Sequence, residues 1–309
     1  MRSHSLNTAQ ALLDDASLEQ LRLIALQYRA RHRAAGRSAG IHASRQRGTG
    51  MDLHDSRPYQ AGDDVRHMDW RATARSSKPV TKVFVADVRR DICLFIDRRP
   101  TMMFGTRRAL KAATAAQIAA LLSFQALAAQ GSVSGLVLDD AAQHFPARTS
   151  FTGILPLLHA AAAPPPHHSR ANQRAGQQRP SGAALLPPGI APAGATLYLI
   201  SDFHDIIKGS ASIADYLPTA RAPGTQVIAI RIVDDAEQRM TPAGVLRLAS
   251  PESMATILVD TDDPALRQRY ALHNAQRSVA LATECALHDI ALFTLTNCDD
   301  LHTQIEPLL

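Results

Sequence analysis

The 309-residue chain has little of what builds disulfide-rich or membrane-spanning proteins. Its three cysteines, Cys93, Cys285 and Cys298, lie far apart, which predicts free thiols and excludes a cysteine metal motif. No apolar run reaches the roughly 18 residues that a transmembrane helix needs. The N-terminal stretch MRSHSLNTAQALLDDAS lacks the long apolar core of a signal peptide, so the sequence favours a cytoplasmic protein.

Acidic residues are absent between Gln20 and Met51, and aromatic residues make up only 5% of the chain. Such an acid-free stretch attracts nucleic acid, anionic lipid or an acidic protein face, or it is simply a solvated basic helix and loop. A series of interleaved aromatic stacking residues is lacking, which disfavours single-strand nucleic-acid binding. The arginines of this stretch are Arg22, Arg29, Arg31, Arg33, Arg37, Arg45 and Arg47.

A glycine-rich loop of the GxxxxGK type is also missing, so any ATP hydrolysis must belong to a partner. What the chain does contain is a core: hydrophobic residues make up 46% and charged residues 20%, as in soluble globular proteins. The runs DICLFID, TLYLISD and TQVIAIRIVD are continuous apolar strands of the kind buried in a parallel sheet, and each ends in an acid.

Helical patterns alternate with these strands, which predicts a doubly wound α/β domain. We expect helices at 107–130, 151–162 and 264–288, further strands at 80–88, 133–139 and 290–296, and a hairpin over 244–260. Ser17 and Gln20 predict a capping box for a first helix that ends near Gly36. Residues 1–88 are interpreted as an N-terminal helix plus a small α+β segment and 89–309 as the α/β domain, with a mobile proline-rich insertion at about 164–194.

One segment, YQAGDDVRHMDWRATARSSKPVTKVF, resembles the signature of the bacterial family called domain of unknown function 58. The later order of strands and helices is similar to the von Willebrand factor A-like fold that this family carries. The resemblance implies a non-catalytic adaptor or co-chaperone encoded beside MoxR-type AAA+ ATPases and acting on a client protein. The signature residues here are Tyr59, Gly62, Asp63, Asp64, Arg66, Asp69, Trp70 and Arg75.

The carboxyl ends of parallel strands meet at one edge of a sheet, so we expect Asp97 and Asp202 to share that edge. A von Willebrand A domain binds a divalent cation there, and the resemblance assigns Asp97, Thr101 and Asp202 to its ligand positions. Arg99 stands where that pattern has a serine, and a guanidinium cannot ligate a cation. Three readings remain open: Arg98 or Arg99 forks the two acids in place of the metal, the arginines display a basic rim outward, or a weak Mg²⁺ site is retained.

The signature and the acids allow other interpretations. The charges around Trp70 form either a buried network that clamps the N-terminal segment or part of a docking face for a partner. The clustered Asp residues and basic N-terminal part also allow a metal-dependent nuclease or phosphoesterase acting on DNA. Ser201, Asp202, His204 and Asp205 are adjacent in sequence, and adjacent residues rarely form a catalytic triad. The sequence thus predicts a protein that is not an enzyme, with no required cofactor.

Overall fold

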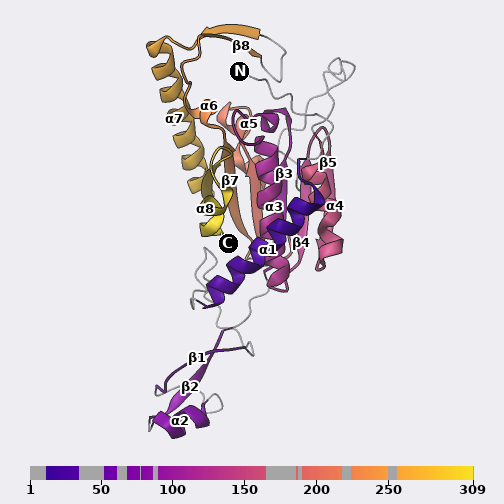
Figure 1. Ribbon diagram of the computed structural model, residues 1–309, viewed down its shortest axis with the longest axis vertical. Coiled ribbons are helices and arrows are strands. Elements are labelled where there is room, and N and C mark those ends of the chain that lie inside the picture. Colours follow the sequence, from indigo (N-terminus) through magenta and orange to yellow (C-terminus); the bar gives the residue numbers. More distant parts are fainter. Residues whose placement is uncertain are drawn as a thin grey trace. The chain divides into compact units, whose positions relative to one another are not determined.

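The computed structural model describes residues 12–34, 52–60, 68–76, 78–85, 90–164, 186, 190–217, 224–249 and 256–308. The chain forms two compact units (Figure 1). The first holds the N-terminal residues up to Leu26 together with the chain from Arg90 to Pro307, and the second holds residues 27–89. Most of the proline-rich insertion, at 165–185 and 187–189, lies outside the described residues.

A six-stranded sheet forms the centre of the first unit, with strand order β10-β7-β6-β3-β4-β5. Only β5 runs antiparallel to its neighbour, which confirms the predicted α/β fold with a mostly parallel sheet. β3 and β6 are adjacent; β4 and β5 follow on the side of β3, and β7 and β10 follow on the side of β6. The strands are β3 (Ile92–Asp97), β4 (Val133–Leu138), β5 (Ala142–Arg148), β6 (Thr196–Ser201), β7 (Gln226–Val233) and β10 (Ala291–Thr296).

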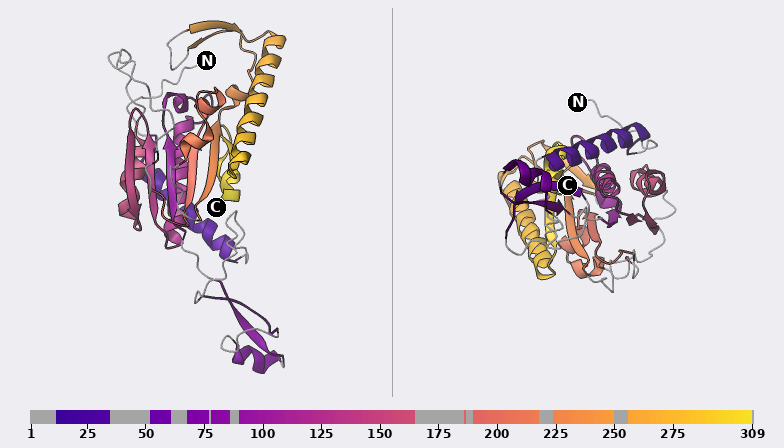
Figure 2. Two further views of the ribbon diagram at one scale, coloured as in Figure 1. Left: turned by 180° about the vertical axis from the view of Figure 1, so that it is seen from behind. Right: turned by 90° about the horizontal axis from the view of Figure 1, so that it is seen from below.

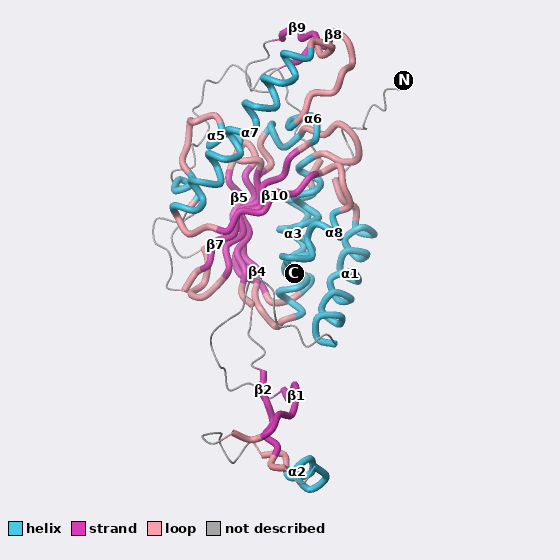
Figure 3. The backbone as a smooth tube through the Cα atoms, turned by 90° about the vertical axis from the view of Figure 1, so that its left-hand side faces the viewer, coloured by secondary structure: helices cyan, strands magenta, loops and turns pink. Residues whose placement is uncertain are grey.

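Helices lie on both faces of this sheet, because its central strands are apolar on both sides. Every residue of β3, β4 and β6 is buried. Figure 3 shows α1 (Asp15–Ala34), α3 (Lys111–Ala128) and α8 (Leu301–Ile305) on one face, and α5 (His204–Ile207) and α7 (Pro264–Leu287) on the other. The remaining short helices are α4 (Phe151–Ala162), α6 (Asp235–Gln238), η2 (Pro100–Met103), η4 (Ile213–Tyr216) and η5 (Glu306–Leu308).

The first helix packs on this unit through its N-terminal half (Figure 2). Leu18, Leu21 and Ala25 are buried, and the Arg22 guanidinium lies 4.5 Å from the centre of the Phe151 ring on α4. The predicted cap at Ser17 is wrong: the Asp14 carboxylate accepts a 2.9 Å hydrogen bond from the Ser17 N–H. The cap is therefore Asp14, and α1 starts at Asp15, about one turn earlier than a cap at Ser17 would start it.

The remaining strands form two small sheets. In the second unit, β1 (Asp52–Pro58) pairs antiparallel with β2 (Val80–Val85), and α2 (Trp70–Ser76) lies between them in sequence. In the first unit, β8 (Val245–Ala249) and β9 (Thr256–Asp260) form the predicted hairpin. None of the helices in the described parts of the chain has the length and apolarity that crossing a bilayer requires.

Candidate functional site

Four acids stand at the carboxyl ends of four adjacent parallel strands. Asp97 ends β3, and Asp139, Asp202 and Asp234 follow β4, β6 and β7 directly. Because β4, β3, β6 and β7 are neighbours and run parallel, these acids line one edge of the sheet. Asp97, Asp202 and Asp234 are buried, so each carboxylate needs partners inside the protein.

Asp97 is held in a bidentate fork by Arg99. The Arg99 Nε donates to Asp97 Oδ1 at 3.0 Å, and Nη2 donates to Oδ2 at 2.7 Å. The Arg99 backbone N–H and the Ser201 hydroxyl add bonds of 3.0 and 2.6 Å to the same carboxylate. Four donors fill the acceptor sites that a carboxylate offers.

The same guanidinium also reaches α5 and η4. It donates to the Asp205 carboxylate, and its Nη2 donates to the Tyr216 hydroxyl at 2.8 Å. Burial alone would lower the pKa of Arg99, but Asp97 and Asp205 outweigh that effect and raise it. An Arg–carboxylate fork was one of the predicted arrangements. The prediction had the arginine bind Asp97 and Asp202, whereas Arg99 binds Asp97 and Asp205.

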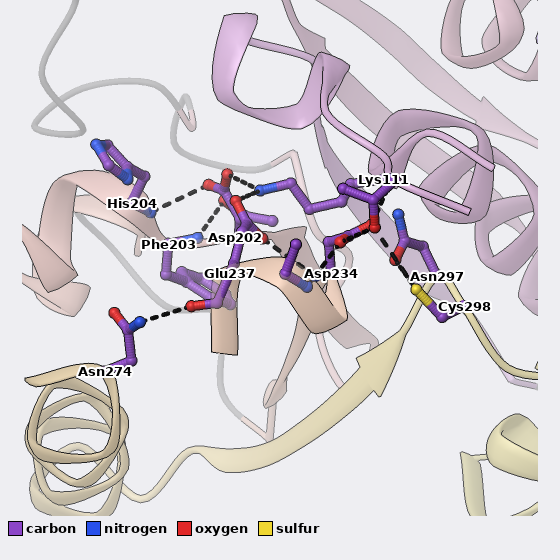
Figure 4. A network of polar contacts seen from close by, with 12 residues as sticks. Lys111, Asp202, Phe203, His204, Asp234, Glu237, Asn274, Asn297 and Cys298 are labelled. Atoms are coloured by element: carbon purple, nitrogen blue, oxygen red, sulfur yellow. Dashed lines mark hydrogen bonds and ion pairs between the residues drawn. The ribbon is translucent and has the colours of Figure 1, made fainter. Parts of the chain in front are cut away.

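Asp202 has a cation of its own, Lys111 (Figure 4). The Lys111 ammonium lies 2.8 Å from Asp202 Oδ2 and 2.7 Å from Glu237 Oε1, and the lysine is 1% exposed. The other oxygen, Asp202 Oδ1, accepts from the His204 N–H at 3.1 Å. Burial opposes both charges, yet Lys111 lowers the pKa of Asp202 and the two acids raise the pKa of Lys111. The group is therefore an ionised lysine between two carboxylates.

Within the described part of the chain, Asp234 forms no ion pair but is bound by neutral donors. The Thr106 hydroxyl and N–H donate to its two oxygens at 2.5 and 2.8 Å, and the Ala236 N–H adds a bond of 2.9 Å. Burial would raise the pKa of Asp234, and these hydrogen bonds together lower it. Glu237 Oε2 accepts from the Asp234 N–H at 3.1 Å, so Glu237 links this acid to Lys111.

Arg98 is buried and links the edge acid Asp139 to the end of α4, since its Nε lies 3.5 Å from Asp139 Oδ2. Its Nη1 donates to the carbonyl oxygens of Ala160, Ala161 and Ala163 at 3.1, 2.6 and 2.9 Å. These are carbonyls at the C-terminus of α4, which lack partners within the helix and carry the negative end of its dipole. The predicted outward display of both arginines is therefore wrong, since Arg98 is buried and Arg99 is engaged by Asp97 and Asp205.

The residues assigned to a metal do not fit a divalent cation. The carboxylate oxygens of Asp97 and Asp202 already accept hydrogen bonds from N–H and O–H donors, including those of the cations Arg99 and Lys111. Thr101 lies half-buried in η2. A divalent ion beside Arg99 and Lys111 would face two fixed positive charges. Within the described residues, no group of three or more His, Cys, Asp or Glu side chains has a metal-binding arrangement.

Sequence reasoning missed Lys111, and the signal for it was present. The helix that follows β3 is apolar on nearly all sides, which is typical of a buried helix. A lone lysine at its first position is consequently buried, and a buried lysine needs an acid partner. Ser201 and Asp205 were weighed as members of a catalytic triad, but the Ser201 hydroxyl donates to Asp97 and accepts from the Phe203 N–H at 2.9 Å.

Comparison with known families accounts for the signature segment. Residues 55–280 match the family described as Protein of unknown function DUF58. The chain is a member of DUF58. The match covers residues 55–89 of the second unit and most of the first unit, including all four acids of the sheet edge.

The individual relatives match a smaller part of the chain or have low sequence identity. Uncharacterized proteins of Mycobacterium tuberculosis and Mycobacterium bovis are 35% identical over 111 residues, which is 36% of this chain. The matched stretch spans about a third of those relatives, 35% of their length. A conserved hypothetical protein, BatB of Bacteroides thetaiotaomicron, has a TM-score of 0.32 at 11% identity over 70% of this chain and 95% of its own. An aerotolerance-related membrane protein of Bacteroides fragilis, mutated to serine at several positions, has a TM-score of 0.32 at 13% identity over 64% and 99%.

The DUF58 signature residues that the structure describes lie in the second unit. Asp69 is the N-terminal cap of α2: its Oδ1 accepts from the N–H groups of Arg71 and Ala72 at 3.1 and 3.0 Å. Tyr59 is half-buried and donates its N–H to the Pro79 carbonyl at 2.8 Å. Trp70 is 66% exposed and Arg75 is exposed, so within this unit they do not form the predicted buried network. Gly62, Asp63, Asp64 and Arg66 lie outside the described residues.

Proposed function

We propose that this DUF58 protein is a non-catalytic adaptor or co-chaperone that works with a MoxR-type AAA+ ATPase in the assembly or remodelling of a client protein. Its α/β unit is proposed to be a von Willebrand A-like, doubly wound domain. The strand order supports this, because it reverses beside β3 and places an antiparallel strand at one border. In sheets of this type, ligands bind at the carboxyl edge beside such a reversal.

The observation that carries the proposal is the saturation of that edge. Each buried carboxylate of β3 and β6 is neutralised by a protein cation, Arg99 for Asp97 and Lys111 for Asp202. The serine hydroxyl between them is engaged on both sides. A degenerate metal site of this kind supplies a rigid platform with fixed charges, which suits recognition of another protein better than bond-breaking chemistry.

The surface above this platform offers both charge and an apolar contact. Phe104, in the loop after η2, is exposed, and Arg107 and Arg108 beside it are largely exposed. Their pairs with Asp235 and Asp300 are long, at 3.7 and 3.9 Å, and are open to solvent, where such pairs contribute little. These arginines are therefore available to an acidic partner surface, and Phe104 provides the kind of aromatic anchor that interfaces favour.

Affinity capture from native lysate tests the adaptor role. Tagged wild-type protein should recover an AAA+ ATPase, and Arg107→Glu should lose most of it, because the reversed charge repels an acidic face. Arg148→Glu, a reversal at an exposed arginine on the border strand β5, should capture as much as the wild type. Equal capture by both variants would remove the sheet edge from the proposal.

Nuclease activity is the outcome that would replace the adaptor role. The protein should be incubated with single- and double-stranded DNA in Mg²⁺ and in Mn²⁺, with Asp97→Ala as the control. Our proposal predicts no cleavage above the level of the variant. Metal-dependent cleavage that Asp97→Ala abolishes would establish the DNA-cleaving enzyme instead.

A further inference from the structure

The β8–β9 ribbon carries an unusual amount of exposed apolar surface. Its large hydrophobic side chains except the half-buried Val259 are exposed, from Leu246 at 38% to Leu258 at 72%. The two strands pair with each other and with no other strand of the described chain. The ribbon stands at the same end of the α/β unit as α6 (Figure 1). The exposed side chains are Val245, Leu246, Leu248, Ile257 and Leu258.

Hydrogen bonds fix the base of this ribbon, so its exposed apolar side chains do not belong to a frayed loop. Thr261 is buried at the end of β9, and its hydroxyl accepts from the Ala243 N–H at 2.8 Å and donates to the Gly244 carbonyl at 2.7 Å. Arg267 on α7 donates to the Thr261 carbonyl at 2.7 Å. Gly244 has a φ of +73°, which few other residues adopt, and it turns the chain into β8. The ribbon therefore projects from α7 in a defined direction.

A two-stranded ribbon leaves one free edge on each strand. The N–H and C=O groups along such an edge pair readily with another extended strand, and two strands alone are only marginally stable. Large apolar residues along the edge strand make that pairing more favourable, because cross-strand contacts stabilise a sheet. The expected occupant of the edge is thus an extended strand rich in apolar residues.

The sequence of β9 fits a second copy of itself. In full antiparallel overlap, the strand Thr-Ile-Leu-Val-Asp places Leu258 opposite Leu258, Ile257 opposite Val259 and Thr256 opposite Asp260. No like charges meet, and apolar residues face one another on both faces of the sheet: the Leu258 pair on one face and the Ile257–Val259 pairs on the other. Full overlap of two β8 strands, Val-Leu-Arg-Leu-Ala, would place Arg247 opposite Arg247. Like charges directly opposite destabilise a strand pair, so the charge pattern favours the β9 edge over the β8 edge.

We propose that two copies of this protein associate through their β9 edges, antiparallel across a two-fold axis, to form a four-stranded sheet. Such a contact is isologous, since each copy presents the same strand to the other. It is independent of the proposed ATPase partnership, and it leaves the edge with Asp97 and Asp202 unchanged. A contact of five paired residues on each side is small, so we expect a dissociation constant in the micromolar range, on the order of 10 μM.

Sedimentation equilibrium on the full chain, at about 1 to 200 μM, tests this association. The wild type should change from monomer to dimer over that range. Leu258→Lys places two ammonium groups at the two-fold axis and should raise the dissociation constant at least about tenfold. Val245→Lys introduces the same charge at a residue of similar exposure, 65%, on the other strand and should leave the dissociation constant unchanged.

Cysteine cross-linking gives a positive readout of the same geometry. Facing residues in an antiparallel pair have Cα atoms about 4.5 to 5.5 Å apart, within reach of a disulfide. Mild copper-catalysed oxidation of Leu258→Cys should give a covalent dimer, whereas Val245→Cys should remain monomeric. A wild type that stays monomeric at 200 μM, or two lysine variants that dissociate alike, would overturn the proposal. If the wild type is monomeric and Leu258→Lys no longer captures the ATPase, the ribbon binds the ATPase instead of a second copy, and the dimer proposal is overturned.

Discussion

At the scale of single residues, three cations organise the carboxyl end of the sheet, of which Arg98 and Lys111 are buried and Arg99 is half-buried. Arg98 binds carbonyl groups of α4, Arg99 forks Asp97, and Lys111 bridges Asp202 and Glu237. Removing a charge from water costs several kcal/mol unless partners compensate, so each of these cations is retained only because its acceptors are in place. Their main contribution is to fix geometry at the strand ends.

The substitution Lys111→Met isolates one of these cations. It leaves Asp202 buried without its counter-charge, and we expect a loss of about 3 to 5 kcal/mol in the free energy of unfolding at pH 7. Urea denaturation followed by circular dichroism measures this loss. Arg107→Met is the control, because this exposed arginine pairs weakly with Asp235, and its removal should cost less than about 1 kcal/mol.

The same variant has a predictable pH dependence. The folded pKa of Asp202 is lowered, so its stabilisation is present above the unfolded value of about 3.9 and is lost as pH falls through the folded value. In Lys111→Met, the buried Asp202 can be protonated instead of charged, and the free-energy cost of protonating it decreases as the pH decreases. The difference between wild type and variant should therefore shrink as pH decreases below about 4. A difference that stays constant as the pH is lowered further below about 4 would mean that the ion pair is not its cause.

At the scale of elements, α1 is an addition to the α/β unit that depends on one apolar stripe. Leu18, Leu21 and Ala25 are buried, whereas Leu23 and Leu26 face solvent. The Gln125 side chain on α3 donates to the Ala25 carbonyl at 3.2 Å, which ties the middle of α1 to the sheet-covering helix. Packing and not helix propensity therefore holds this helix in place.

A matched pair of substitutions on α1 tests that statement. Leu18→Ala removes a side chain that is 1% exposed and should reduce the free energy of unfolding by about 2 to 4 kcal/mol. Leu23→Ala makes the same chemical change at a residue that is 59% exposed and should cost less than about 0.5 kcal/mol. Both values come from urea titrations of the full chain. Similar losses for the two variants would contradict the packing of α1 on this face.

Elements with a strong local pattern could be predicted from the sequence. The continuous apolar runs gave β3, β6 and β7, and Asp263 followed by Pro264 gave the start of α7, where the Asp263 carboxylate accepts from the Ala265 N–H at 2.8 Å. Strand β5, AQHFPAR, was missed because it is largely exposed and contains a proline. It is a strand because it lies at the border of the sheet, where a proline is tolerated. The local sequence does not indicate that border position.

At the scale of the whole molecule, the candidate site is assembled from distant parts of the chain. Strand ends placed Asp97 and Asp202 on one edge, and the sequence predicted this because parallel strands end together. The pairing of Asp202 with Lys111 depends on how α3 returns over the sheet, and that of Arg99 with Asp205 on the turn after β6. Such contacts span 91 and 106 residues and leave no periodicity in the sequence.

The central claim is that protein cations, and not a divalent metal ion, neutralise Asp97 and Asp202 at the sheet edge. Titration calorimetry with Mg²⁺ and Mn²⁺ tests it most directly, using wild type, Asp97→Asn and the double variant Arg99→Ser with Lys111→Ser. We predict no saturable heat for the wild type, and binding in the double variant, where the carboxylates are released. A saturable wild-type isotherm that disappears in Asp97→Asn would contradict the account.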